Sequence, residues 1–193
     1  MRSTLLQREV DIQLGHLWLA GDLVVPEMAQ GFILFAHGSG SSRLSPRNQQ
    51  VAHQLNAAGY GTLLFDLLAP QERIVDEQTA ELRFDIDLLA SRLTATVDWV
   101  LRQRDLESFN IGLFGASTGA AAALVTAAER QGEVSAVVSR GGRPDLAAQH
   151  LPHVTAPSLM IVGEEDPIVA ELNRQAMRHM RCKCELKMVP GAT

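Results

Sequence analysis

Three short runs of apolar residues constrain the fold of this chain more than any other feature of its sequence. They occupy residues 31–36, 60–65 and 109–114 and carry almost no polar side chains. Runs of this length and composition are typical of strands that are buried on both faces. Because such strands occur mainly in parallel sheets that helices cover, we expect an α/β fold.

Segments with helical periodicity separate these strands. The first helix is predicted to begin at Ser45 and Pro46, a capping residue followed by a first-turn proline, and to stop at Gly59. A long helix is predicted from about Phe84 to Arg104, and shorter ones after residues 117 and 168. This alternation favours right-handed crossovers and a mainly parallel sheet with helices on both faces.

The remaining strands complete the predicted sheet. Residues 5–13 and 16–25 alternate in polarity and predict two antiparallel N-terminal strands. Three further strands are expected at 134–138, 158–162 and 185–189. The polar residues 69–81 are interpreted as a connection that could cover a site. Since no repeat or shift in composition occurs, we expect residues 1–193 to form a single α/β domain.

The charge of the chain argues against two classes of partner. Its formal net charge is -5, whereas nucleic acids and anionic membranes are bound through basic surfaces. A small molecule is therefore the expected ligand, with no cofactor or metal. The oligomeric state stays open, a homo-oligomer included.

Neither the N-terminus nor the cysteines indicate export. Residues 1–11 mix charged and apolar side chains, unlike a secretory signal, and no run approaches the roughly 18 apolar residues of a membrane helix. Cys182 and Cys184 are too close and too isolated to predict a disulfide framework or a zinc site. We expect two ordinary thiols and a cytoplasmic protein.

The strand at residues 109–114 leads into Gly115-Ala-Ser-Thr-Gly119 and then into an alanine-rich helix. Strand, sharp turn and helix form the context of a nucleophile elbow, which exposes a serine hydroxyl at its tip. Ser117 is the candidate nucleophile, and the two glycines leave room for a strained backbone and the following helix. The alternative is a turn of small residues that serves only helix packing.

A glycine-rich loop follows the first buried strand, at the same edge of the sheet as Ser117. It begins His37-Gly38-Ser39-Gly40, and its backbone N–H groups can form half of an oxyanion hole. We expect the Ser39 amide, or that of Gly40, to complete this hole with the Thr118 amide. His37 is either a base or a brace that holds the loop with Gly38 and Gly40, and bracing is favoured.

Further polar residues follow two later strands. Asp166 lies latest in a run of three acids and could orient an imidazole. The alternative is that these acids cap the next helix, with Glu164 or Glu165 serving the structure. Arg140 and Arg143 could bind a substrate carboxylate or phosphate, or could be surface arginines without a specific partner.

Taken together, these loops resemble those of α/β hydrolases of the dienelactone-hydrolase-like group, in the family's order and over nearly the whole chain. The resemblance implies a hydrolase that acts on a small ester, thioester or lactone through Ser117 and Asp166. Dienelactone hydrolases proper use a cysteine nucleophile, so their lactone specificity is not carried over.

The histidine of this family follows the last strand, where this sequence holds only Val189-Pro-Gly-Ala-Thr193. Without a base the chain is expected to be nearly inactive, because losing a triad member costs orders of magnitude in rate. We expect the natural chain to continue beyond Thr193 with a catalytic histidine and a covering helix. His150 or His153 is a less favoured substitute.

Two other classes of function compete with hydrolysis. A dinucleotide turn is suggested by Gly112, Gly115 and Gly119, but their spacing does not fit Gly-x-Gly-x-x-Gly. A hydrolase fold that binds a ligand or partner without catalysis would explain the missing base.

Overall fold

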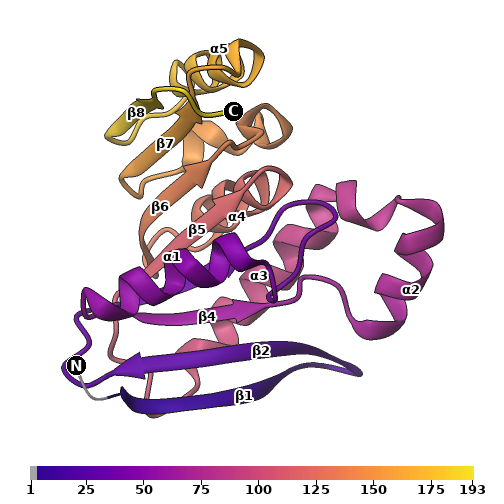
Figure 1. Ribbon diagram of the computed structural model, residues 1–193, viewed down its shortest axis with the longest axis vertical. Coiled ribbons are helices and arrows are strands. Elements are labelled where there is room, and N and C mark those ends of the chain that lie inside the picture. The colour runs from indigo at the N-terminus through magenta and orange to yellow at the C-terminus, as the bar shows by residue number, and fades with distance from the viewer. Residues whose placement is uncertain (1–3) are drawn as a thin grey trace.

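The computed structural model describes residues 4–193, so the first three residues of the 1–11 stretch lie outside the described part. It contains one sheet with the strand order β1-β2-β4-β3-β5-β6-β7-β8 (Figure 1). The strands are β1 (Thr4–Leu14), β2 (Leu17–Pro26), β3 (Phe32–Ala36), β4 (Gly61–Phe65), β5 (Ile111–Ala116), β6 (Val134–Arg140), β7 (Ser158–Gly163) and β8 (Cys184–Val189). The α-helices are α1 (Pro46–Ala57), α2 (Pro70–Thr79), α3 (Ile86–Leu101), α4 (Thr118–Glu129) and α5 (Pro167–Met177).

The sheet is parallel from β4 through β8 in its strand order, whereas β2 runs antiparallel to both of its neighbours, β1 and β4. The three apolar runs of the sequence form β3, β4 and β5, which lie next to one another at its centre. Their side chains are largely buried because helices lie on both faces. The predicted α/β fold with antiparallel N-terminal strands is confirmed.

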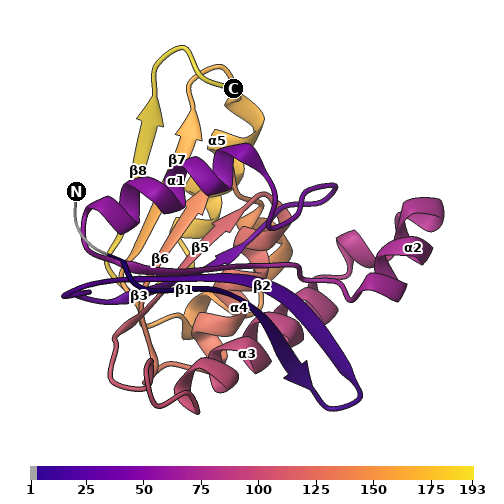
Figure 2. The ribbon, with the colours of Figure 1, turned by 60° about the horizontal axis from the view of Figure 1, so that its bottom comes forward.

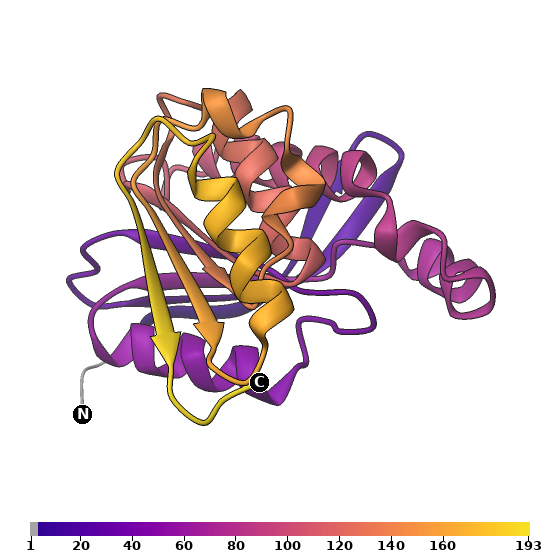
Figure 3. The ribbon, with the colours of Figure 1, turned by 90° about the horizontal axis from the view of Figure 1, so that it is seen from above.

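Successive residues of the central strands serve two separate cores. Leu34 packs into the larger apolar cluster and Phe35 into a smaller one under α1. This is the two-residue alternation of a strand. Helix α1 covers one face, whereas α3, α4 and α5 cover the other (Figures 2 and 3).

The α1 face is not covered along its whole width. On the strands β7 and β8, Leu159 and Ile161 are half-buried and Glu185 and Lys187 are exposed. Among residues 4–193, no helix lies over this part of the face (Figure 3).

The polar connection predicted at residues 69–81 is mostly helical, and the sequence analysis did not predict this helix. This segment contains α2, which projects from the body together with a 3-10 turn at Leu82–Phe84 (Figure 1). We call residues 70–84 the α2 arm. The α2 arm has no stripe of apolar residues, and polar contacts hold it in place. Pro70 opens the helix, and the Ala69 amide donates to Glu72 Oε2 at 2.8 Å.

Two other helix predictions need correction at their ends. The long helix begins at Ile86, because Asp85 is its N-cap and accepts a hydrogen bond from the Leu88 amide, and it ends at Leu101. Ser45 occupies the N-cap position of α1, but its side chain makes no capping hydrogen bond.

Within residues 4–193 no helix combines the length and the hydropathy that crossing a bilayer would demand.

Candidate active site

Ser117 joins β5 to α4 and adopts φ 51° and ψ -120°, a conformation that side chains other than glycine rarely adopt. Hydrogen bonds hold it there: its amide donates to the Arg140 carbonyl at 3.3 Å, and its carbonyl accepts from the Arg143 amide at 3.2 Å. Strain of this kind persists only where the surroundings impose it, and it is concentrated at functional sites.

The glycines on either side of Ser117 are required by close packing. A Cβ on Gly115 would lie 2.4 Å from Ala120 Cα, and one on Gly119 would lie 2.2 Å from the Ala36 carbonyl oxygen. Both distances are too short for any side chain, so the expected role of these glycines is confirmed. The tip of the turn is thereby pressed between β3 and α4.

The glycine-rich loop after β3 reaches the same point. A Cβ on Gly38 would lie 3.0 Å from Ser117 Cβ, so the loop passes directly beside the candidate nucleophile. Thr118 is the first residue of α4, and its amide has no acceptor within the helix. Ser39 and Thr118 line one cavity of about 620 Å³. Both predicted oxyanion donors thus border a common space.

His37 is placed as a brace. The Leu67 amide donates to His37 Nε2 at 3.1 Å, so Nδ1 carries the proton and donates to the Gly38 carbonyl at 3.0 Å. Burial lowers the pKa of His37, although the Gly38 hydrogen bond and the charge of Asp66 act in the opposite direction. With both ring nitrogens engaged, this imidazole is not free to take a proton from Ser117.

A second brace of the loop was not found from the sequence. Arg43 pairs with Asp22 at 2.7 Å, and its amide donates to Asp66 Oδ1 at 2.8 Å. Gly40, at φ 69°, turns the loop between His37 and Arg43. The only signal in the sequence was Asp66 directly after an apolar strand.

Asp166 caps α5. Its Oδ1 accepts a hydrogen bond from the Val169 amide at 3.1 Å, whereas Glu164 and Glu165 are exposed. The alternative that an acid of this run caps the next helix is therefore confirmed, but the capping acid is Asp166 rather than Glu164 or Glu165. Capping uses one carboxylate oxygen of Asp166, and the side chain is half-buried.

The last residues of the chain lie against the Asp166 loop. The Glu165 amide donates to the Ala192 carbonyl at 2.9 Å, and the Glu164 amide to the Val189 carbonyl at 3.0 Å. A Cβ on Gly163 would lie 2.2 Å from the Ala192 oxygen. Figure 3 shows the C-terminus between the end of β8 and the start of α5. Thr193 is thus held beside the candidate acid.

The two candidate anion-binding arginines differ in their surroundings. Arg143 makes a bidentate ion pair with Asp145, at 2.9 and 2.7 Å. The Arg140 guanidinium lies 5.9 Å from the centre of the Phe114 ring, under α1. Burial and the nearby charge of Arg47 lower the pKa of Arg140. Within residues 4–193 Arg140 has no carboxylate partner.

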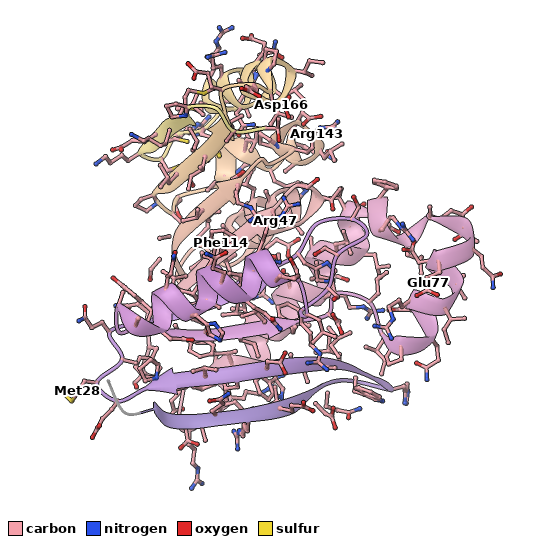
Figure 4. The ribbon with its side chains drawn as sticks, in the orientation of Figure 1. Met28, Arg47, Glu77, Phe114, Arg143 and Asp166 are labelled. Carbon is pink, nitrogen blue, oxygen red and sulfur yellow. The ribbon has the colours of Figure 1, made fainter. Side chains whose placement is uncertain are left out.

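The cavity next to Ser39 has a polar wall that sequence reasoning missed. The α2 arm contributes four charged residues to it, namely Arg73, Asp76, Glu77 and Arg83. Figure 4 shows Glu77 on this projecting arm. The sequence analysis predicts only a polar connection here, so helical spacing could not be used to group these residues. Pro70 and Glu72, at the first and third helical positions, were the available signal.

Metal ligands do not gather in the described part of the chain, residues 4–193, where no group of three or more His, Cys, Asp or Glu could hold an ion. Cys182 and Cys184 are free thiols. Burial, together with the neighbouring Cys182 and Glu185, raises the pKa of Cys184 to about 11. This thiol is therefore a poor nucleophile at neutral pH.

Comparisons with known proteins place these features in a family context. The sequence profile of the dienelactone hydrolase family matches residues 20–193. A crystal structure described as a dienelactone hydrolase from Anabaena variabilis is 51% identical with a TM-score of 0.96, covering 97% of this chain and 87% of that one. Est1E from Butyrivibrio proteoclasticus is 16% identical with a TM-score of 0.79, covering 95% and 88%. The likeness to Est1E shows the fold alone.

Two curated sequences from Mycobacterium tuberculosis are each 53% identical to this chain over 189 residues, which is 98% of its length. Both bear a provisional name, phosphoribosyl transferase. This chain spans 42% of the length of these relatives. Their name therefore describes proteins of which more than half lies outside the matched segment.

Proposed function

Because the chain belongs to the dienelactone hydrolase family, we propose that it is a serine hydrolase that cleaves a small carboxylic ester, thioester or lactone through an acyl-enzyme. The observation that carries the proposal is the backbone of Ser117. Its positive φ, in a turn pressed between β3 and α4, presents the hydroxyl beside the Gly38 loop and the first amide of α4.

In the proposed reaction Ser117 Oγ attacks the substrate carbonyl carbon. The amides of Thr118 and Ser39 stabilise the negative charge that develops on the carbonyl oxygen. A histidine takes the serine proton and returns it to the leaving alcohol, thiol or ring oxygen, which leaves an acyl-enzyme. Water, activated by the same histidine, then releases the acid and restores Ser117.

We propose that this histidine follows Thr193 in the natural protein. All six histidines of the sequence lie within residues 4–193, and of these His37 alone lines the cavity, with both ring nitrogens engaged. The Ala192 carbonyl accepts a hydrogen bond from the amide of Glu165, the neighbour of Asp166 in the sequence, so residues that followed Thr193 would begin near the candidate acid.

The size of the cavity supports a small substrate. A volume of about 620 Å³ accommodates a compact ligand. Arg140 does not line this cavity, but its carbonyl accepts a hydrogen bond from the Ser117 amide, and within residues 4–193 its guanidinium has no carboxylate partner, whereas Asp145 already neutralises Arg143. We therefore propose Arg140, rather than Arg143, as the residue that favours acidic esters.

The test is labelling of the gene product, with any residues that follow Thr193, by an active-site-directed fluorophosphonate. Wild type and Ser91→Ala, a control at an exposed serine of α3, should label equally. Ser117→Ala should lose the label. Equal labelling of wild type and Ser117→Ala would exclude Ser117 as the nucleophile.

A non-catalytic binding protein is the second candidate, favoured by the engaged imidazole of His37. It becomes the leading function if the gene ends at Thr193 and the wild-type protein takes up no label. The transferase name of the Mycobacterium tuberculosis relatives is not extended to this chain, because the shared segment is the part that matches the hydrolase family.

A further inference from the structure

The strand β8 forms one edge of the sheet, and its outer side pairs with no strand of residues 4–193 (Figures 1 and 2). Such an edge presents unpaired N–H and C=O groups that can pair with another chain. The opposite edge, β1, is interrupted by a register shift between Thr4 and Leu6. Irregularities of that kind discourage pairing, and β8 has none.

The pairing with β7 decides which groups of β8 point outwards. Ser158 N–H donates to the Lys183 carbonyl at 2.9 Å, and Glu164 N–H to that of Val189 at 3.0 Å. Because alternate residues of a strand address the same neighbour, Glu185 and Lys187 also direct their backbone groups to β7. The residues whose backbone groups face outwards are Cys184, Leu186 and Met188.

A second copy of β8 can pair with these outward groups in an antiparallel, two-fold arrangement. If Leu186 lies opposite the partner's Leu186, the two residues exchange both backbone hydrogen bonds. Glu185 then lies opposite the partner's Lys187, and the symmetry repeats this pair. Because the backbone groups of Glu185 and Lys187 point to β7, this facing pair is a non-hydrogen-bonded one. In an antiparallel sheet, side chains of non-hydrogen-bonded pairs lie closest together.

The charges of β8 distinguish this register from its neighbours. A shift of two residues in one direction places Glu185 opposite the partner's Glu185, and a shift in the other places Lys187 opposite the partner's Lys187. Like charges at facing positions are destabilising. Both side chains are exposed. Glu185 is 64% exposed, and its ion pair with Lys183 at 3.1 Å is weak enough to be exchanged.

We propose that two copies of this chain associate edge to edge through β8, antiparallel, with Leu186 on the two-fold axis and a Glu185–Lys187 pair on either side. The sheet then continues from one copy into the other. This arrangement is independent of the chemistry at Ser117 and makes the β8 edge an interaction surface for a second copy of the chain.

The test is the dimer dissociation constant of the gene product, with any residues that follow Thr193, measured by sedimentation velocity over a wide concentration range. Glu185→Lys and Lys187→Glu each place like charges opposite one another, so each should raise the dissociation constant at least about tenfold. The double variant Glu185→Lys with Lys187→Glu should restore dimers. An equimolar mixture of the two single variants should form heterodimers, because all facing pairs are again opposite in charge.

Glu107→Lys is the control matched to Glu185→Lys, since it changes the net charge by the same amount at an exposed position outside β8. It should leave the dissociation constant unchanged. A wild-type chain that stays monomeric at every concentration would overturn the proposal. So would a dimer that persists in both single variants, because it would use another surface or bind through a different strand.

Discussion

At the scale of single residues, the site depends on one strained position. Ser117 holds a positive φ because its amide and carbonyl are fixed by the loop after β6, while Gly115 and Gly119 allow β3 and α4 to approach. Side chains other than glycine in such conformations cost on the order of 1–3 kcal/mol. The placement of the half-buried Ser117 at the tip of this turn therefore costs stability.

This strain predicts that Ser117→Gly increases the stability of the fold. Glycine adopts the observed φ of 51° freely, so the free energy of unfolding should rise by about 1 kcal/mol in urea titrations. Ser117→Ala keeps a Cβ and the strain, so its stability should stay close to that of wild type. A glycine variant no more stable than the alanine variant would show that the turn is not strained.

At the scale of elements, the α2 arm is held by a buried ion pair. The side chain of Asp76 is 6% exposed, and it accepts hydrogen bonds from the Arg83 amide at 2.9 Å and from Arg83 Nε at 2.7 Å. Burial alone would raise the pKa of Asp76, but the hydrogen bonds from Arg83 outweigh it and lower the pKa. The arm has few apolar contacts to replace this pair.

Asp76→Asn should therefore loosen the arm. It removes the charge that binds Arg83, and a charged hydrogen bond of this kind contributes about 1.5–3 kcal/mol. Limited proteolysis should cut within residues 70–84 faster than in wild type. Glu171→Gln, which breaks an exposed pair with Arg174, is the control and should leave the cleavage rate unchanged. If the Asp76→Asn variant were cleaved at the same rate as wild type, contacts other than the Asp76–Arg83 pair would hold the arm.

The elements that the sequence predicted well are those whose burial requires a recognisable run of apolar residues in the sequence. The apolar runs of β3, β4 and β5 and the elbow at Ser117 follow from short-range composition, and they lie where they were expected. The α2 arm was missed because its contacts are polar and non-local, as in the pairing of Glu72 with Arg92 of α3. The Arg43 brace and the stacking of Arg140 on Phe114 also join residues that are distant in sequence, so periodicity could not reveal them.

At the scale of the whole molecule, the half-buried His37 links the site to the stability of the fold. The pKa of His37 is lowered from 6.5, chiefly by burial, and the attraction of Asp66 does not compensate. Below pH 6.5 the unfolded chain therefore binds a proton at this residue that the folded chain does not. Stability should consequently fall as the pH decreases through 6.5.

The measurement is the free energy of unfolding in urea between pH 8 and pH 5, compared in wild type and His37→Gln. Glutamine cannot be protonated in this pH range. The slope of the unfolding free energy against pH should therefore be smaller in the variant than in wild type, by up to about 1.4 kcal/mol per pH unit. The carboxyls of Asp76 and Asp98 have pKa values lowered from 3.8, so the stability that they contribute is lost only at more acidic pH and in both proteins. Identical slopes between pH 6.5 and pH 5 would mean that folded His37 accepts a proton as readily as the unfolded chain, which is incompatible with the Leu67 amide donating to its Nε2.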